Sequence, residues 1–230
     1  MVPSGPKDLR LGDLLVGKPG ASFGLFLPRQ QWLIAQGSVR LVSVPARKAR
    51  PKTVEVALVS GQLRARATRL GGGVRVRSGA VTCQAPRGRF RVRLKGARLR
   101  VESIDAYVAV TGPHAARTVP PSTGLDLGPR PGFAHRLPPA PEGLRPVQAC
   151  AIRPPRMRWS PTRGALGYRL QVATDTDFLD LRLDRTVSGT TFTPTVLPSG
   201  KYYWRVLARD GTREGLPSKI YSFSVDVACR

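Results

Sequence analysis

The sequence predicts an all-β protein of two domains, and three observations carry that prediction. Between residues 54 and 110 apolar side chains alternate with polar or basic ones, as in Leu63-Arg64-Ala65-Arg66. Only a strand with one buried face satisfies a period of two, so helices are excluded there. A proline-rich break follows residue 112, and seven further strands can be placed beyond it, between residues 147 and 227.

Short apolar segments open the chain. Residues 9–16, 22–27, 31–34 and 38–44 are predicted strands, separated by glycine and proline. From residue 54 to residue 110, further glycines divide the alternating pattern at short intervals. This stretch is therefore predicted to form about seven short strands, an ordinary number for one sheet.

Several motifs of the first half occur together in one known family. They are Gly12-Asp13, Gly37-Ser38-Val39, the segment 56–63, and Arg87-Gly88 followed by Phe90. With them, residues 9–112 resemble a FecR-type domain, the extracytoplasmic module of bacterial cell-surface signalling regulators that also occurs in other envelope proteins. The resemblance implies a twisted, solenoid-like stack of short strands. The strand spacing agrees, because strands with one apolar face must stack to bury it.

Residues 113–146 have a different composition. Nine prolines occur in these 34 residues, with no sustained apolar period. Such a segment is predicted to be extended and polyproline-like, a semi-rigid linker. The alternative, a recognition tract for a proline-binding partner, has no strong motif behind it. The predicted organisation is therefore a first domain at 1–112, a linker at 113–146 and a second domain at 147–230.

The second domain resembles a fibronectin type III domain. Trp159 stands where that family has the core tryptophan of its second strand, and residues 168–173 match the third strand. Leu197 and, six residues later, Tyr203 match the leucine and the corner tyrosine, whose hydroxyl bonds back to the backbone. With a closing strand at 218–227, the resemblance implies a seven-stranded antiparallel β-sandwich.

The chain is strongly basic. It has 38 Lys and Arg against 14 Asp and Glu, a net charge of +24. Residues 1–140 contain 24 basic and 6 acidic side chains, so 18 of those 24 charges belong to the first half. Such a field attracts polyanions such as nucleic acid, anionic headgroups or acidic envelope polymers. The alternative is that the arginines only keep a β surface soluble and protect sheet edges.

The period of two places many of these charges on outward positions of the predicted strands. Side by side, they would form a dense basic face suited to phosphate or carboxylate groups. Aromatic residues are almost absent from this face and no recognition helix is found, so the sequence disfavours nucleic acid as a partner. The candidate binding residues are Arg64, Arg66, Arg75, Arg77, Arg89, Arg91, Arg93, Lys95, Arg98 and Arg100.

No catalytic arrangement is recognised. There is no GxSxG motif, and both histidines, His114 and His135, fall in the predicted linker. The glycines at 71–73 lack the spacing of a phosphate-binding loop. The acidic residues between 175 and 184 miss the spacing of a calcium loop and are interpreted as a surface loop. We expect no enzyme activity, no cofactor and no metal site.

The three cysteines lack CxxC spacing. In a sandwich of this type, the ends of the first and last strands approach one pole, which predicts a disulfide between Cys150 and Cys229. The prediction requires their Cα atoms to lie within about 7 Å. Cys83 alternates inward with its neighbours and is predicted to be a buried, unpaired thiol. A disulfide would indicate an oxidising compartment.

The sequence contains no apolar run of the roughly 18 residues that a membrane span needs, and residues 1–6 do not resemble a secretory signal. From the resemblance we expect a periplasmic or cell-envelope location, with the cytoplasm as the alternative. The leading function is non-enzymatic binding or scaffolding, in which the basic face contacts an anionic envelope polymer or a partner protein. The alternatives are a FecR-type, anti-sigma-factor-like regulator of cell-surface signalling and a nucleic-acid-binding protein.

Overall fold

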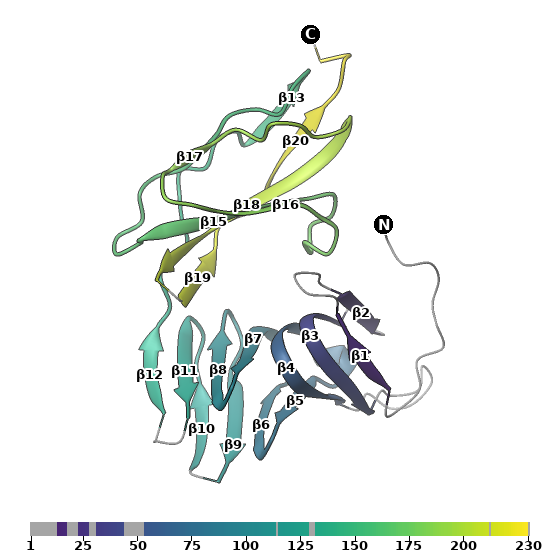
Figure 1. Cartoon of the computed structure of the whole chain (residues 1–230), viewed down its shortest axis with the longest axis vertical. Coiled ribbons are helices and arrows are strands. Elements are labelled where there is room, and N and C mark those ends of the chain that lie inside the picture. The colour runs from purple at the N-terminus through teal and green to yellow at the C-terminus, as the bar shows by residue number, and fades with distance from the viewer. Residues whose placement is uncertain are drawn as a thin grey trace. The chain divides into compact units, whose positions relative to one another are not determined.

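The computed structural model describes residues 13–17, 23–27, 31–43, 53–113, 115–128, 132–211 and 213–229. Within these ranges the regular structure consists of strands and one three-residue 3-10 turn, η1 (Arg69–Gly71). The predicted all-β fold is confirmed. The chain divides into two compact units, residues 1–136 and residues 137–230, and each is described by itself (Figure 1).

The described strands of the first unit form one twelve-stranded sheet. Neighbouring strands are antiparallel, except that β4 and β5 are parallel. The strands are β1 (Leu14–Val16), β2 (Phe23–Leu27), β3 (Gln31–Ser43), β4 (Val54–Ala67), β5 (Val74–Ser78), β6 (Val81–Ala85), β7 (Gly88–Lys95), β8 (Arg98–Ser103), β9 (Val108–Gly112), β10 (Ala115–Val119), β11 (Thr123–Leu127) and β12 (Phe133–Arg136).

Strand β4 is the centre of this sheet. Along one edge it pairs with β3, which also pairs with β1 and β2. Along its other edge, the first half of β4 pairs with β5 and the second half with β7. The sheet therefore divides into two branches, β5-β6-β9-β10 and β7-β8-β11-β12.

Two glycines let β3 and β4 continue where the sequence predicts breaks. Gly37 and Gly61 lie opposite each other with φ angles of 109° and 84°. A Cβ atom at Gly61 would lie 2.0 Å from the carbonyl oxygen of Gln36, so no larger residue fits. At this crossing the buried positions of β4 change from even numbers, ending at Leu58, to odd numbers, starting at Leu63. Residues 54–112 consequently form six strands rather than about seven.

The first unit has an apolar core that is rich in valine. Leu63, Val92, Val101 and Leu125 occupy one row across β4, β7, β8 and β11, and each is at most 2% exposed. Removing such side chains from water stabilises the fold by about 1.5–3 kcal/mol each. The inward half of the predicted alternation is thus the apolar core of the first unit.

The predicted linker is wrong for residues 113–136. This stretch forms β10, β11 and β12, which pair with β9, β8 and β11 respectively. Pro113, Pro120 and Pro121 lie between strands, where no ladder hydrogen bond is lost. Residues 137–146 belong to the second unit, and the side chain of Leu144 is part of its core.

The described strands of the second unit form a six-stranded and a two-stranded sheet. Strands β19 and β20 both pair with β18, one after the other, and together act as one interrupted closing strand. Counted this way, the unit has seven strand positions, all antiparallel except β13 beside β20. The strands are β13 (Gln148–Ala151), β14 (Met157–Arg158), β15 (Gly167–Ala173), β16 (Leu181–Val187), β17 (Thr191–Phe192), β18 (Gly200–Asp210), β19 (Arg213–Pro217) and β20 (Tyr221–Val225).

Aromatic side chains fill the core of the second unit. Trp159 packs edge-on against Tyr168, with ring centroids 5.5 Å apart, and Trp204 is completely buried. The predicted corner tyrosine is wrong by one residue. Tyr202, not Tyr203, is buried and donates its hydroxyl hydrogen to a backbone carbonyl four residues earlier, at 2.7 Å. Successive residues of a strand face opposite sides, so a shift of one position exchanges core for surface.

Candidate functional site

Eight of the ten predicted binding residues lie together on the face of β4, β7 and β8 that points away from the apolar core, and we call them the basic stripe. Arg91 is buried within it. The register of these strands places four pairs directly opposite one another on neighbouring strands. Like charges directly opposite on a sheet destabilise it unless something compensates them. The pairs are Arg66 with Arg89, Arg64 with Arg91, Arg93 with Arg100, and Lys95 with Arg98.

Arg75 and Arg77 do not belong to this stripe. They lie on β5, which pairs with the first half of β4, whereas β7 pairs with the second half. Both guanidinium groups contact the carboxylate of Glu55, at 3.1 and 2.5 Å, and Arg75 also donates to Gln84. The prediction that all ten charges share one continuous surface is therefore wrong. Alternation along a strand indicates which side chains point outward, but it does not indicate which half of β4 a neighbouring strand pairs with.

Carboxylates compensate part of the stripe. The Arg91 Nε and a Glu102 oxygen are 2.9 Å apart, and their side chains are only 8% and 2% exposed. Arg89 pairs with Asp105 at 2.8 Å, and Arg100 pairs with Asp126. The sequence analysis did not predict these carboxylate partners. Glu102 could have been identified, because it occupies the same set of alternate strand positions as Arg98 and Arg100.

The stripe has defined neighbours on both sides. On β3, Trp32 lies opposite Arg66 and Ile34 lies opposite Arg64, and both apolar side chains are buried. An aromatic residue thus borders the face from which aromatics were predicted to be almost absent. On the other side, the register places Glu102 opposite Arg91 and Asp126 opposite Arg100.

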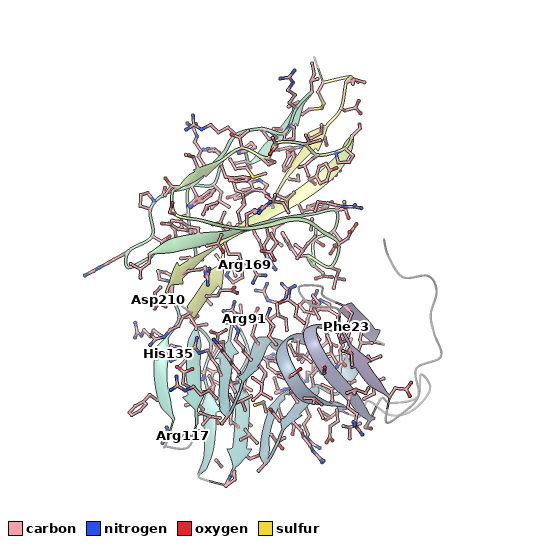
Figure 2. All side chains as sticks on the ribbon, viewed as in Figure 1. Phe23, Arg91, Arg117, His135, Arg169 and Asp210 are labelled. Atoms are coloured by element: carbon pink, nitrogen blue, oxygen red, sulfur yellow. A yellow bond between two sulfur atoms is a disulfide. The ribbon has the colours of Figure 1, made fainter. Side chains whose placement is uncertain are left out.

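His135 also lies on this face of the sheet, on β12 rather than in a linker. It stands opposite Gly124, and a Cβ atom added there would be 2.4 Å from the imidazole Nε2. Its Nδ1 lies 3.6 Å from a carboxylate oxygen of Asp126. Figure 2 marks His135 and Arg91 on their strands in the first unit. His114 lies outside the described residues.

The charge of the first unit cannot be balanced internally. Residues 1–136 contain the same 24 basic and 6 acidic side chains as residues 1–140, because residues 137–140 are uncharged. Even if every carboxylate neutralises one cation, 24 minus 6 leaves 18 positive charges. Counterions or an anionic partner must screen them.

The cysteines meet the geometry that the sequence predicts. Cys150, on β13, and Cys229, beyond β20, are joined by a disulfide with their Cα atoms 5.3 Å apart. Parallel pairing of β13 with β20 brings the two ends together, and the Asp226 N–H donates to the Ala151 carbonyl. Cys83 is a free, buried thiol.

We expect Cys83 to resist alkylation in the folded protein. Burial raises the pKa of its thiol to about 12, so very little reactive thiolate exists at neutral pH. Iodoacetamide labelling followed by mass spectrometry should show almost no adduct on the native protein and one adduct after unfolding without reductant. Stoichiometric labelling of the native protein would contradict this expectation.

The acidic side chains predicted to form a surface loop between residues 175 and 184 have structural partners. Asp175 accepts hydrogen bonds from the backbone N–H groups of Asp177, Leu179 and Asp180, which fixes their loop. Arg169 contacts Asp184 at 2.5 Å and a second carboxylate on β19. Burial alone would lower the pKa of Arg169, but these hydrogen bonds and charges raise it overall. Figure 2 marks Arg169 on its strand.

The described residues contain neither a candidate metal cluster nor a candidate membrane-spanning helix. Among those residues, no group of three or more His, Cys, Asp or Glu side chains is placed to hold a metal ion. In the same part of the chain, no helix has the length and apolar character that crossing a membrane requires.

Comparison with known proteins gives partial structural likenesses. No family model matches the chain. No curated protein sequence matches it either. A solved structure from Parabacteroides distasonis described as a "putative anti-sigma factor" has a TM-score of 0.46 and 14% identity, and the match covers 54% of this chain and 59% of that one. This chain thus spans less than two thirds of that protein.

A second likeness is to an Fn3-like protein from Clostridium thermocellum. It has a TM-score of 0.32 and 22% identity, covering 38% of this chain and 93% of that one. The structural neighbours of this chain thus include an Fn3-like protein besides the one from Parabacteroides, each matched over a part of the chain.

Proposed function

We propose that this protein is a non-enzymatic binding or scaffolding protein of the bacterial cell envelope, and that the basic stripe of its first unit contacts an anionic partner. The observation that carries the proposal is the register of the stripe. Four like-charge pairs lie directly opposite one another on β4, β7 and β8. An anion that binds beside exposed members of these pairs, such as Lys95 and Arg98, lowers the repulsion between them.

The chemistry of the stripe suits phosphate and carboxylate groups. Seven of its eight members are arginines, whose planar guanidinium group forms two parallel hydrogen bonds to such anions. Several of them are already oriented by neighbours. Arg93, for example, donates two hydrogen bonds to the side-chain amide oxygen of Gln62. A side chain held in one geometry loses less conformational entropy on binding.

The envelope location is supported by the disulfide and by the sequence resemblance. A disulfide persists in compartments such as the periplasm and is rare in the reducing cytosol. The FecR-like motifs of the first half belong to a module that works outside the cytoplasm. Purification from periplasmic and cytoplasmic fractions under thiol-trapping conditions tests the location, and a reduced, cytosolic protein would overturn it.

The proposal predicts binding to acidic polymers that weakens steeply with salt. Each Lys or Arg side chain that neutralises an anionic group of the polymer releases counterions, so log K falls as log salt rises. Titration of the full chain with polyglutamate and with heparin, followed by calorimetry at several salt concentrations, measures this dependence. Absence of binding at low salt, or affinity independent of salt, would contradict the proposal.

A further inference from the structure

Two arginines of the second unit lie side by side on its smaller sheet. Arg145 pairs with Arg158 of β14 in an antiparallel bridge, and their backbones exchange N–H···O bonds of 2.8 and 2.9 Å. The chain neighbours Leu144 and Trp159 are buried in the core. Because successive residues of an extended segment face opposite sides, both arginine side chains point outward, and both residues are exposed.

The arginine pair lacks the compensation that other cations of this protein have. No described carboxylate, that of Glu142 included, forms an ion pair with either arginine. Residues 143–174 contain six arginines and no acidic residue. Of these six, Arg169 contacts two carboxylates from other parts of the unit. The guanidinium groups of the pair are therefore accessible to an anion from solution, unlike that of the buried Arg91.

Two hydroxyl groups flank the pair. Thr191 of β17 lies opposite Arg158, and Ser160 follows Arg158 by two positions, so both face the same side as the arginines. Both residues are exposed, and no described group bonds to either hydroxyl. A Cβ atom at Gly143, two positions before Arg145, would lie 2.3 Å from the Ser160 Oγ. The glycine thus leaves room for this hydroxyl beside the arginines.

We propose that this arginine pair and the two hydroxyls form a second anion site, and that its ligand is a terminal phosphate group, as in a phosphate monoester or inorganic phosphate. The site belongs to the second unit, so it does not depend on the proposed function of the stripe. The Cα atoms of a hydrogen-bonded pair are about 5.5 Å apart, so both guanidinium groups can reach one small anion.

The number of oxygens selects the ligand. Each guanidinium fork binds two oxygens along one edge of an anion. A carboxylate has one such edge, and so does a phosphodiester, whose other two oxygens are esterified. A terminal phosphate group has three free oxygens and three edges, so it accepts both forks and the hydroxyl hydrogens.

Charge favours the same ligand. A phosphate monoester carries about −1.5 to −2 charges at pH 7, which matches the two positive charges of the pair. Its second pKa is about 6, whereas arginine stays protonated throughout this range. Lowering the pH from about 7.5 to about 5 protonates the phosphate and removes one acceptor. We therefore expect the affinity to fall over that interval.

Nuclear magnetic resonance titration of the ¹⁵N-labelled full chain tests the inference, because each backbone N–H is observed separately. The probes are inorganic phosphate, glycerol 1-phosphate, dimethyl phosphate and acetate, at about pH 7.5 and constant ionic strength. We expect the first two to shift the resonances of Arg145, Arg158, Ser160 and Thr191, and the tighter of them shows whether a free ion or an ester is preferred. Dimethyl phosphate and acetate lose at least one charge-assisted hydrogen bond and should bind about tenfold or more weakly.

Variants place the phosphate on the arginine pair. Arg145→Gln/Arg158→Gln removes both forks and should weaken phosphate binding ~100-fold, about tenfold for each. Arg158→Lys keeps the charge but loses the fork, and should weaken binding about tenfold. The control Arg185→Gln/Lys219→Gln removes two charges from exposed positions of the same unit and should leave the affinity unchanged. Thermal melts show whether the variants are folded.

The outcomes decide the inference without deciding the proposed function. If phosphate leaves the four resonances unchanged, or if both double variants lose the same affinity, the arginine pair is not a phosphate site. If acetate or dimethyl phosphate binds as tightly as inorganic phosphate, the assignment to a terminal phosphate is wrong. Should the double variant not fold, Arg158→Lys decides, and an affinity equal to that of the unmodified protein overturns the site. Binding of polyglutamate and heparin is measured separately and tests the stripe.

Discussion

Loss of the disulfide between Cys150 and Cys229 is expected to lower the free energy of unfolding of the second unit by about 4.5 kcal/mol. The two cysteines are 79 residues apart in sequence, and a cross-link that closes a loop of that length removes much conformational entropy from the unfolded chain. For a unit of this size, we expect the midpoint of thermal unfolding to fall by roughly 20 °C.

The measurement compares the oxidised protein with the variant Cys150→Ala/Cys229→Ala. Trp159 and Trp204 are both in the core of the second unit, so their fluorescence follows its unfolding. As the control, adding reductant should lower the transition of the oxidised protein but not that of the double variant. A difference of less than about 1 kcal/mol between the two proteins would show that the disulfide does not constrain this unit.

The variant Glu102→Ala is expected to destabilise the first unit by about 3–5 kcal/mol. Glu102 is almost completely buried beside Arg91, and removing it leaves a buried guanidinium without that carboxylate. Breaking a buried ion pair by removing one member costs more than breaking an ordinary surface ion pair. Urea unfolding followed by the fluorescence of Trp32 measures the effect, because Trp32 is the tryptophan of the first unit.

Two comparison variants isolate the cause. Asp105→Ala breaks the ion pair with Arg89, whose side chain is 41% exposed, and should cost no more than about 1 kcal/mol. Arg91→Met/Glu102→Leu removes both buried charges and should recover most of the stability that Glu102→Ala loses. If Asp105→Ala and Glu102→Ala cost the same, burial does not set the strength of this pair.

The core of the first unit could be predicted from the sequence because burial of one strand face imposes a period of two. Leu63, Val92 and Val101 are inward positions by alternation alone, and the structure places them in one row. The same reasoning wrongly ended the first domain at residue 112, whereas the first unit extends to Arg136. Strands β10 and β12 are short and have largely exposed side chains, so they have little apolar alternation, and the prolines near them suggested a linker.

The candidate site was only partly predictable. Alternation predicts that Arg64, Arg77 and Arg91 point outward, but it does not give the pairing of strands. Strand β4 meets β5 in parallel and β7 antiparallel, and this long-range choice separates Arg77 from the other two. Register also determines that Arg91 meets Glu102. The corner tyrosine shows the same sensitivity, since one position separates Tyr202 from Tyr203.

The pairing of β10 and β11 has a practical consequence for dissecting this protein. A fragment that ends at residue 112 would remove the neighbour of β9 and the neighbour of β8 at the same time. Two rows of unsatisfied backbone N–H and C=O groups would then be open to other molecules, which is how edge strands begin to aggregate. Recombinant expression of the first unit should therefore use a stop after Arg136, where the compact unit ends.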